Sequence, residues 1–274
     1  MSYKLSEKEI FVVGQELKHM KGIMENNFIG IDYTVICILA LDIIEQVLGE
    51  QYEFPIDIEE IVKNIGVEVI YQPLNRVRSG EEKHVHKVVG SFFTRPNLVT
   101  GVPITCIMID SEAGVAEQRY ALAHELVHCL IHKSEKMFSS SYRVMPMLFK
   151  DMEEVVADAF AIFMLIPLPI FLKTFYEYIR SQSEPVRTSE WLHYLNIIAN
   201  VPYEDVAIGY QNIRYVFGIL YKIKHDEKAM ENFCKRIREV TSDETRDEVI
   251  EIAKKQIQKT LSVMNEEVEN VLFW

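Results

Sequence analysis

Hydrophobic and polar positions follow helical spacing at both ends of the chain. Apolar residues recur three and four positions apart between residues 10 and 24, after a capping box at Ser6–Glu9, and residues 33–48 are apolar on nearly every side. The first pattern predicts an amphipathic helix, and the second predicts a helix that is buried all round. A third helix is expected between Asp57, which can cap its first turn, and Gly66, which favours its end.

Three short runs rich in β-branched and aromatic residues predict strands, at residues 67–71, 87–94 and 104–110. Pro- and Gly-containing turns lie between the last two runs, so we expect those two strands to pair. The polar segment 76–85 is expected to be a loop.

Beyond the strands, the spacing is helical for most of the remaining chain. The last helix is expected to begin in a capping box at Thr241–Glu244. Its apolar face starts at Ile250 and keeps a three/four spacing as far as Val271, with charged residues opposite.

The composition is that of a globular chain with an acidic balance. Of the 274 residues, 49% are hydrophobic and 26% charged, which is enough apolar material for a sizeable core. The formal charge of −12 disfavours direct binding to nucleic acid, because phosphate contacts need clustered cations.

The cysteines and the apolar stretches indicate a cytoplasmic protein without membrane spans. The four cysteines form no CxxC pair and are too few for a secreted disulfide framework. The first residues show no signal-peptide pattern. The longest uncharged apolar stretch, residues 159–172, is broken by two prolines and is shorter than a span requires.

The chemistry-bearing segment is an HExxH motif, His124-Glu125-Leu-Val-His128. On a helix, residues four apart lie on one face, so both imidazoles can reach one metal ion. Glu125 then lies beside them, where it could act on a metal-bound water. The alternative explanation of the motif is a helix with two hydrogen-bonded histidines and a surface glutamate, without a metal.

A second acidic segment supplies candidates for a third ligand. Glu154 and Asp158 are four residues apart on a helix expected to end at Pro167. A catalytic zinc site commonly has three protein ligands and one open position, which His124, His128 and Glu154 would complete. Asp158 could accept the N–H of His124 or His128. Glu153 is the competing ligand candidate, and a simply polar helix face is the plain alternative.

The remaining histidines fit a metal site less well. His132 lies about 12 Å along the helix from His124, and the segment between lacks the glycine turn of HExxHxxGxxH peptidases. His84 and His86 alternate in a polar segment, and a solvated loop explains them better than metal binding.

Taken together, these residues resemble the ImmA/IrrE family of metallopeptidases. The matching blocks are Pro55–Gly66, Gln118–His128 and Glu154–Pro167, followed by a helical segment at Trp191–Gly218. The resemblance implies Zn²⁺ held by His124, His128 and Glu154, with Glu125 as the general base. It also implies an α+β fold, a mostly helical zincin-like core with a small β-sheet packed on the HExxH helix. Family members act on helix-turn-helix repressors, so such a repressor is the expected protein substrate.

The chain is therefore expected to contain a metallopeptidase domain at residues 55–218, between helical extensions at 1–54 and 219–274. The predicted reaction is limited hydrolysis of peptide bonds in a regulatory protein. Tyr120, Tyr142, Tyr203 and Tyr210 are candidates for a further donor to the oxyanion. The rival hypotheses are a module that binds a repressor without cutting it, a structural zinc domain and a membrane-associated peptidase.

Overall fold

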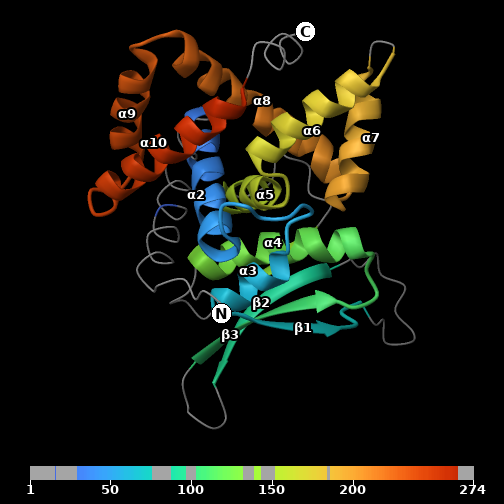
Figure 1. Ribbon diagram of the computed structural model, residues 1–274. Helices are drawn as coiled ribbons and strands as arrows, with labels where there is room; N and C mark the ends of the chain where they lie inside the picture. The colour runs from blue at the N-terminus through green and yellow to red at the C-terminus, as the bar shows by residue number, and fades with distance from the viewer. Residues whose placement is uncertain are drawn as a thin grey trace.

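The computed structural model in Figure 1 shows a four-stranded sheet with a set of packed helices on one side of it. The structure describes Glu16 and residues 30–75, 88–96, 103–131, 139–142, 152–183 and 186–264. The predicted helix at 10–24 lies outside these residues apart from Glu16, and the predicted loop at 76–85 lies outside them entirely. The mixture of many helices with one small mixed sheet confirms the expected α+β class.

The sheet has the strand order β1-β3-β2-β4. Its strands are β1 (Glu68–Gln72), β2 (Val88–Pro96), β3 (Pro103–Asp110) and β4 (Ser139–Tyr142). The predicted pairing of the second and third strands is confirmed, since β2 and β3 run antiparallel with Phe92 opposite Ile107. β1 lies parallel to β3, and β4 lies antiparallel to β2. β4 was not predicted, because Ser-Ser-Ser-Tyr has no hydrophobic alternation.

Helix α4 (Val115–Ile131) lies across the sheet and carries the HExxH motif (Figure 1). It packs on β2 and β3, and its residues from Tyr120 onward are buried. Gly90 and Phe92, two positions apart on β2, both face α4. The small sheet therefore packs against the helix that carries the motif, as the family resemblance implies.

Helix α5 (Met152–Leu165) packs on the other side of α4, between the sheet layer and the remaining helices (Figure 1). The apolar helix α2 (Gly30–Leu48) packs against α5 and is buried nearly all round from Tyr33 onward, which confirms its prediction. Helix α8 (Tyr203–His225) approaches α5 closely at Gly209, where an added Cβ would lie 2.4 Å from Ile162. α5 thus packs against α4, α2 and α8.

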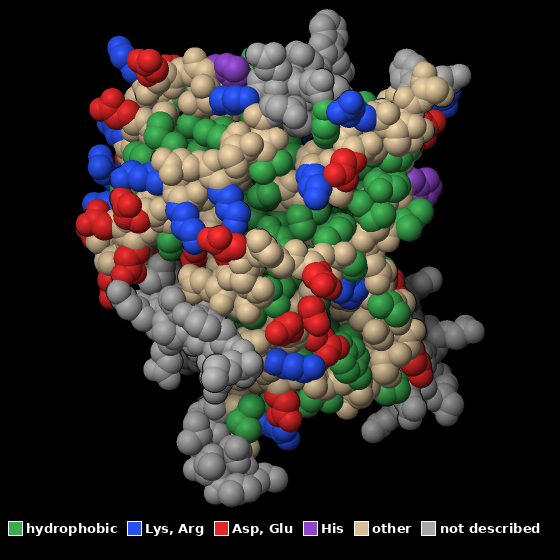
Figure 2. Space-filling model, viewed as in Figure 1, with side chains coloured by type: hydrophobic (Ala, Val, Ile, Leu, Met, Phe, Trp, Pro, Cys, Tyr) green, Lys and Arg blue, Asp and Glu red, His purple; other side chains and the backbone are tan. Residues whose placement is uncertain are grey.

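The other helices complete the core. They are α3 (Ile58–Asn64), α6 (Leu168–Ser181), α7 (Thr188–Ala199), α9 (Ala229–Val240) and α10 (Arg246–Val263). α10 packs against α2, so the described parts of the predicted extensions, residues 30–54 and 219–264, contribute to the same hydrophobic core as the predicted domain at 55–218. Charged side chains of both signs cover α9 and α10 at the left of Figure 2, as expected for solvated faces.

Two helix boundaries agree with the sequence and one does not. Asp57 Oδ1 accepts the backbone N–H of Glu60 at 3.0 Å, and Gly66 follows α3 with φ of +86°. The prediction that Thr241 begins the last helix was wrong: its hydroxyl donates to the Ile237 carbonyl at 2.8 Å and closes α9. α10 begins at Arg246 and ends at Val263, and the pattern beyond residue 264 lies outside the described residues.

Among the residues that the structure describes, no single helix is long and apolar enough to cross a membrane. The segments Glu153–Leu165 and Leu168–Ser181 reach that length and composition only together, and they are bent by 58° where they meet.

Candidate metal centre

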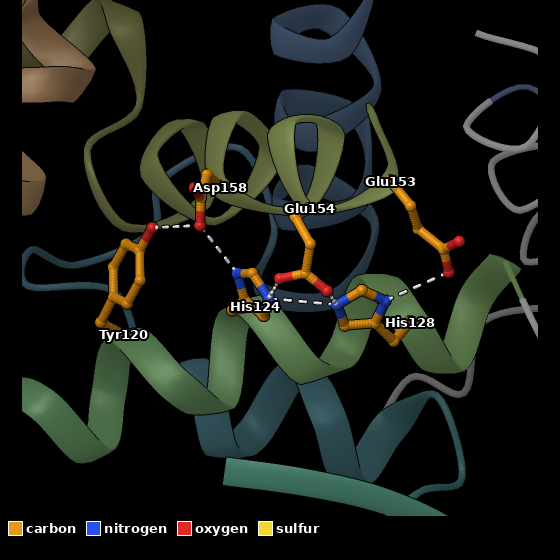
Figure 3. Close-up of polar contacts among 6 residues, drawn as sticks. All are labelled: Tyr120, His124, His128, Glu153, Glu154 and Asp158. Carbon is orange, nitrogen blue, oxygen red and sulfur yellow. Dashed lines mark hydrogen bonds and ion pairs between the residues drawn. The ribbon is translucent and has the colours of Figure 1, made fainter. Parts of the chain in front are cut away.

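The two histidines of the HExxH motif lie one turn apart on the same buried face of α4. His124 and His128 are almost completely buried, and their ring centroids are 4.9 Å apart. Their Nε2 atoms are 3.0 Å apart and point toward the same space (Figure 3). The i, i+4 spacing thus produces the paired arrangement expected from the sequence.

Helix α5 places Glu154 between these two nitrogens (Figure 3). Glu154 Oε2 is 3.2 Å from His124 Nε2, and Oε1 is 3.3 Å from His128 Nε2. Tetrahedral ligands about 2.1 Å from a zinc ion lie about 3.4 Å from one another, so the three separations fit a metal site. The cluster of His124, His128 and Glu154 is therefore compatible with a bound metal.

The outer nitrogens of both histidines face further carboxylates of α5. His124 Nδ1 is 3.0 Å from Asp158 Oδ1, an ion-pair distance whose angle is off the line of a hydrogen bond. His128 Nδ1 is 3.4 Å from Glu153 Oε1. Asp158 thus lies beside His124, one of its two predicted partners, while the competing ligand candidate Glu153 lies at the outer edge of His128 (Figure 3).

Tyr120, one turn before His124 on α4, also belongs to this arrangement. Its hydroxyl donates to Asp158 Oδ1 at 2.8 Å, so this candidate oxyanion donor is directed at a carboxylate (Figure 3). The rings of Tyr203 and Tyr210 contact His193 and Phe171, respectively. The side chain of Tyr142 and the residues His84, His86 and His132 lie outside the described part of the chain.

The charges of the cluster hold it in an ion-paired form when no metal is bound. Burial would lower the pKa of His124, but Asp158 and Glu154 outweigh it and raise that pKa to about 10. The pKa of His128 is also raised, by Glu153 and Glu154 against the effect of burial. Burial would raise the pKa of Glu154, but its contacts with both histidines hold that pKa well below its ordinary value.

Glu125 is fully buried between α4 and β2. A Cβ added at Gly90 would lie 2.9 Å from Glu125 Cγ and 3.2 Å from Ala121 Cβ. The negative charge of Glu125 contributes to the raised pKa of His124, which agrees with its position next to the cluster. Sequence reasoning missed Gly90, because the glycine lies in a strand about 35 residues before the motif.

The two residues Gln118 and Arg119, in the first half of α4, connect this helix to neighbouring segments by hydrogen bonds. Gln118 Nε2 donates to the Asp110 carbonyl at the end of β3, at 2.9 Å. The Arg119 guanidinium donates to the Ile56 carbonyl at 2.9 Å. From the sheet, the ring of Phe92 on β2 stacks on the ring of His128, with the ring centroids 6.0 Å apart. These contacts orient the helix that carries the histidines.

Comparison with known proteins identifies one family. A family model described as the IrrE N-terminal-like domain, Peptidase_M78, matches residues 62–201. The match is slightly more than half of the chain and runs from within α3 to just beyond α7, so it includes the sheet, α4 and α5. The comparisons with curated proteins and with solved structures found no match.

Proposed function

Since the chain belongs to the Peptidase_M78 family of IrrE N-terminal-like domains, we propose that it is a zinc-dependent endopeptidase that cuts a specific regulatory protein. The observation that carries this proposal is the convergence of His124, His128 and Glu154 on one point, with buried Glu125 next to them. Two histidines and one carboxylate are the ligand set of several catalytic zinc sites.

The proposed reaction uses three residues as metal ligands and one as the general base. His124, His128 and Glu154 hold the ion, and Glu154, with 30% of its side chain exposed, lies on the open side of the cluster. Zinc in this position would polarise the scissile carbonyl and make water a nucleophile near neutral pH. Glu125 accepts the proton of the attacking water and delivers it to the leaving amine.

The rival hypotheses differ from this one in their ligand sets and in their need for a base. A closed structural zinc site needs four protein ligands, whereas the cluster found in the described part of the chain offers three. A module that only binds a repressor needs no general base, which disfavours it because Glu125 is present and buried beside the metal ligands.

We further propose a helix-turn-helix repressor as the substrate and the cytoplasm as the compartment. We carry over a helix-turn-helix repressor as the substrate from the family resemblance. A cytoplasmic setting agrees with the four cysteines, all of which are buried free thiols. The net charge of −12 favours action on the regulator rather than on its DNA.

The first test is metal content. We expect about one zinc per chain in the wild type and a strong loss of zinc in both His124→Ala and Glu154→Ala. Glu177→Ala, which removes an exposed carboxylate on α6, is the matched control and should keep its zinc. A wild-type protein that takes up no zinc, even when zinc is supplied, would contradict the proposal.

The second test separates cutting from binding. Glu125→Gln should keep zinc but lose about 10²–10⁴-fold in peptide hydrolysis, because it lacks the base. Newly formed protein N-termini can be compared between cells that produce the wild type and cells that produce Glu125→Gln. A few cuts in a DNA-binding regulator, made by the wild type alone, are expected; identical N-termini in both would support the binding module.

A further inference from the structure

Helix α5 presents a carboxylate to each nitrogen of the two histidines. Glu154 lies between the inner Nε2 atoms, at 3.2 and 3.3 Å. Asp158 lies 3.0 Å from the outer Nδ1 of His124, and Glu153 lies 3.4 Å from the outer Nδ1 of His128 (Figure 3). Each histidine therefore has one carboxylate of α5 near Nε2 and another near Nδ1. Glu153 and Glu154 are adjacent in the sequence but face different nitrogens of His128.

The position of Glu153 distinguishes an orienting role from a ligating one. The two nitrogens of an imidazole point in different directions, so a carboxylate on Nδ1 cannot also reach an ion on Nε2. Glu153 lies beyond His128 on the side away from Glu154 (Figure 3). Its side chain is 12% exposed, less than half the value for Glu154, so it is directed inward rather than into solvent.

Phe92 and Glu153 together restrict the ring of His128. Phe92 stacks on its face with an angle of 7° between the ring planes, which limits rotation out of that plane. A half-turn of the ring about the Cβ–Cγ bond would restore the same plane, but it would exchange Nδ1 with carbon and give up the contact with Glu153. A carboxylate accepts but does not donate, so it favours the tautomer with the proton on Nδ1 and the lone pair on Nε2.

We propose that Glu153 is the positioning residue of His128, which fixes its Nδ1–H tautomer and aims Nε2 at the metal. The inference rests on the proposed function, because it assumes that the cluster binds zinc. Asp158, which accepts the hydroxyl of Tyr120, lies at an ion-pair distance of 3.0 Å from the outer nitrogen of His124. The acidic first turn of α5 thus supplies one ligand and one orienting group in consecutive residues.

Zinc affinity, measured by competition with a chelator of known affinity, tests this role in the wild type and in four variants, one of which is the ligand variant His128→Ala. Glu153→Ala should bind zinc about 10–100-fold more weakly than the wild type. Glu153→Gln should bind with intermediate affinity, because its carbonyl oxygen can still accept the N–H. Glu177→Ala removes the same charge from an exposed site on α6 and should bind like the wild type.

Nitrogen-15 NMR of the zinc-loaded proteins gives a signature that a loss of stability would not produce. The wild type should show His128 as the Nδ1–H tautomer, with a slowly exchanging proton on that nitrogen. In Glu153→Gln the proton should remain with a weaker hydrogen-bond shift, and in Glu153→Ala it should exchange rapidly with water. His124 should keep its signal in both variants.

The outcomes separate this inference from the proposed function. If the wild type binds zinc and both Glu153 variants match it in affinity and in the His128 signal, the positioning role is wrong and the peptidase proposal stands. If Glu153→Ala loses zinc as completely as His128→Ala, Glu153 is a ligand and the positioning role is again wrong. If the wild type binds no zinc, the proposed function fails first. Glu153→Gln keeps the test valid should Glu153→Ala not fold.

Discussion

Carboxylates lie between packed helices at the metal centre and also in the core around Glu45, and their partners differ in the two places. At the metal centre, Glu154 and its neighbours on α5 face the histidines of α4. Between α2 and α10, the carboxylate of Glu45 accepts from Lys259 Nζ at 2.6 Å and from Gln256 Nε2 at 3.0 Å. The second cluster joins residues 211 positions apart in the sequence, whereas α4 and α5 follow each other with only β4 between them in the described part of the chain.

The partners decide what each cluster can do. Glu45 faces hydrogen-bond donors. Burial would raise its pKa, but the hydrogen bonds from Lys259 and Gln256 outweigh burial and lower that pKa. That cluster is balanced without an ion. The histidines of the other cluster can each release a proton and offer a lone pair to a metal. Burial of carboxylates alone therefore does not indicate a site, but carboxylates facing convergent histidines do.

The largest expected effect comes from Gly90→Ala, which should damage the metal centre without changing a ligand. The new Cβ would lie 2.9 Å from Cγ of the fully buried Glu125, so the side chain of Glu125 has to shift. Since a shift of about 1 Å in a reacting group can cost roughly 10²-fold, we expect such a loss of peptidase activity with zinc retained. Gly218→Ala is the control, because nothing lies within 4 Å of its Cβ position. Full activity in Gly90→Ala would mean that the position of Glu125 does not matter.

Glu45→Ala should affect stability and leave zinc binding intact. We expect the free energy of unfolding to fall by about 1–3 kcal/mol, since buried hydrogen bonds to charged groups are lost. The cost stays moderate because the side chains of Lys259 and Lys255 are 32% and 56% exposed and can regain water. Denaturant unfolding measures the effect. Glu251→Ala, which breaks an exposed ion pair with Lys254 on α10, should lower the free energy of unfolding much less. An equal loss in both variants would remove the distinction between them.

The pH dependence of zinc binding should distinguish the two clusters directly. The pKa of His124 is raised from 6.5 to about 10 without metal, so at neutral pH the imidazole carries a proton that zinc must displace. Zinc affinity should therefore rise at least about tenfold per pH unit from about pH 7 toward pH 10 and fall as the solution is acidified. Chelator competition at several pH values measures the slope. Glu45→Ala should show the same slope, and a flat wild-type profile would contradict the assignment of His124.

The smallest effect is expected for Tyr120→Phe, which removes only the hydroxyl that holds Asp158. The loss of one such hydrogen bond should weaken zinc affinity by about two- to tenfold. Tyr176→Phe, which removes the hydroxyl that accepts from Arg180 on α6, serves as the control. A complete loss of zinc in Tyr120→Phe would give Tyr120 a larger role than the support of Asp158.

Features that depend on neighbours in the chain could be predicted from the sequence. The cap at Asp57, the end of α3 at Gly66, the buried helix α2 and the pairing of β2 with β3 all follow from local patterns. Thr241 shows the limit of such patterns, because its hydroxyl can serve the helix before it as well as the helix after it. The edge strand β4 depends on hydrogen bonds to β2, and its serines carry no pattern that marks them.

The sequence by itself determined that His124 and His128 share a helix face, because 3.6 residues per turn place positions four apart together. It also limited the third ligand to the acids at the start of α5. Only the tertiary structure decided that Glu154 lies between the Nε2 atoms, that Asp158 and Glu153 take the outer nitrogens, and that Gly90 lies against Glu125. The physical reason is that the spacing along one helix is fixed by its own backbone, whereas contacts between elements depend on how the whole core packs.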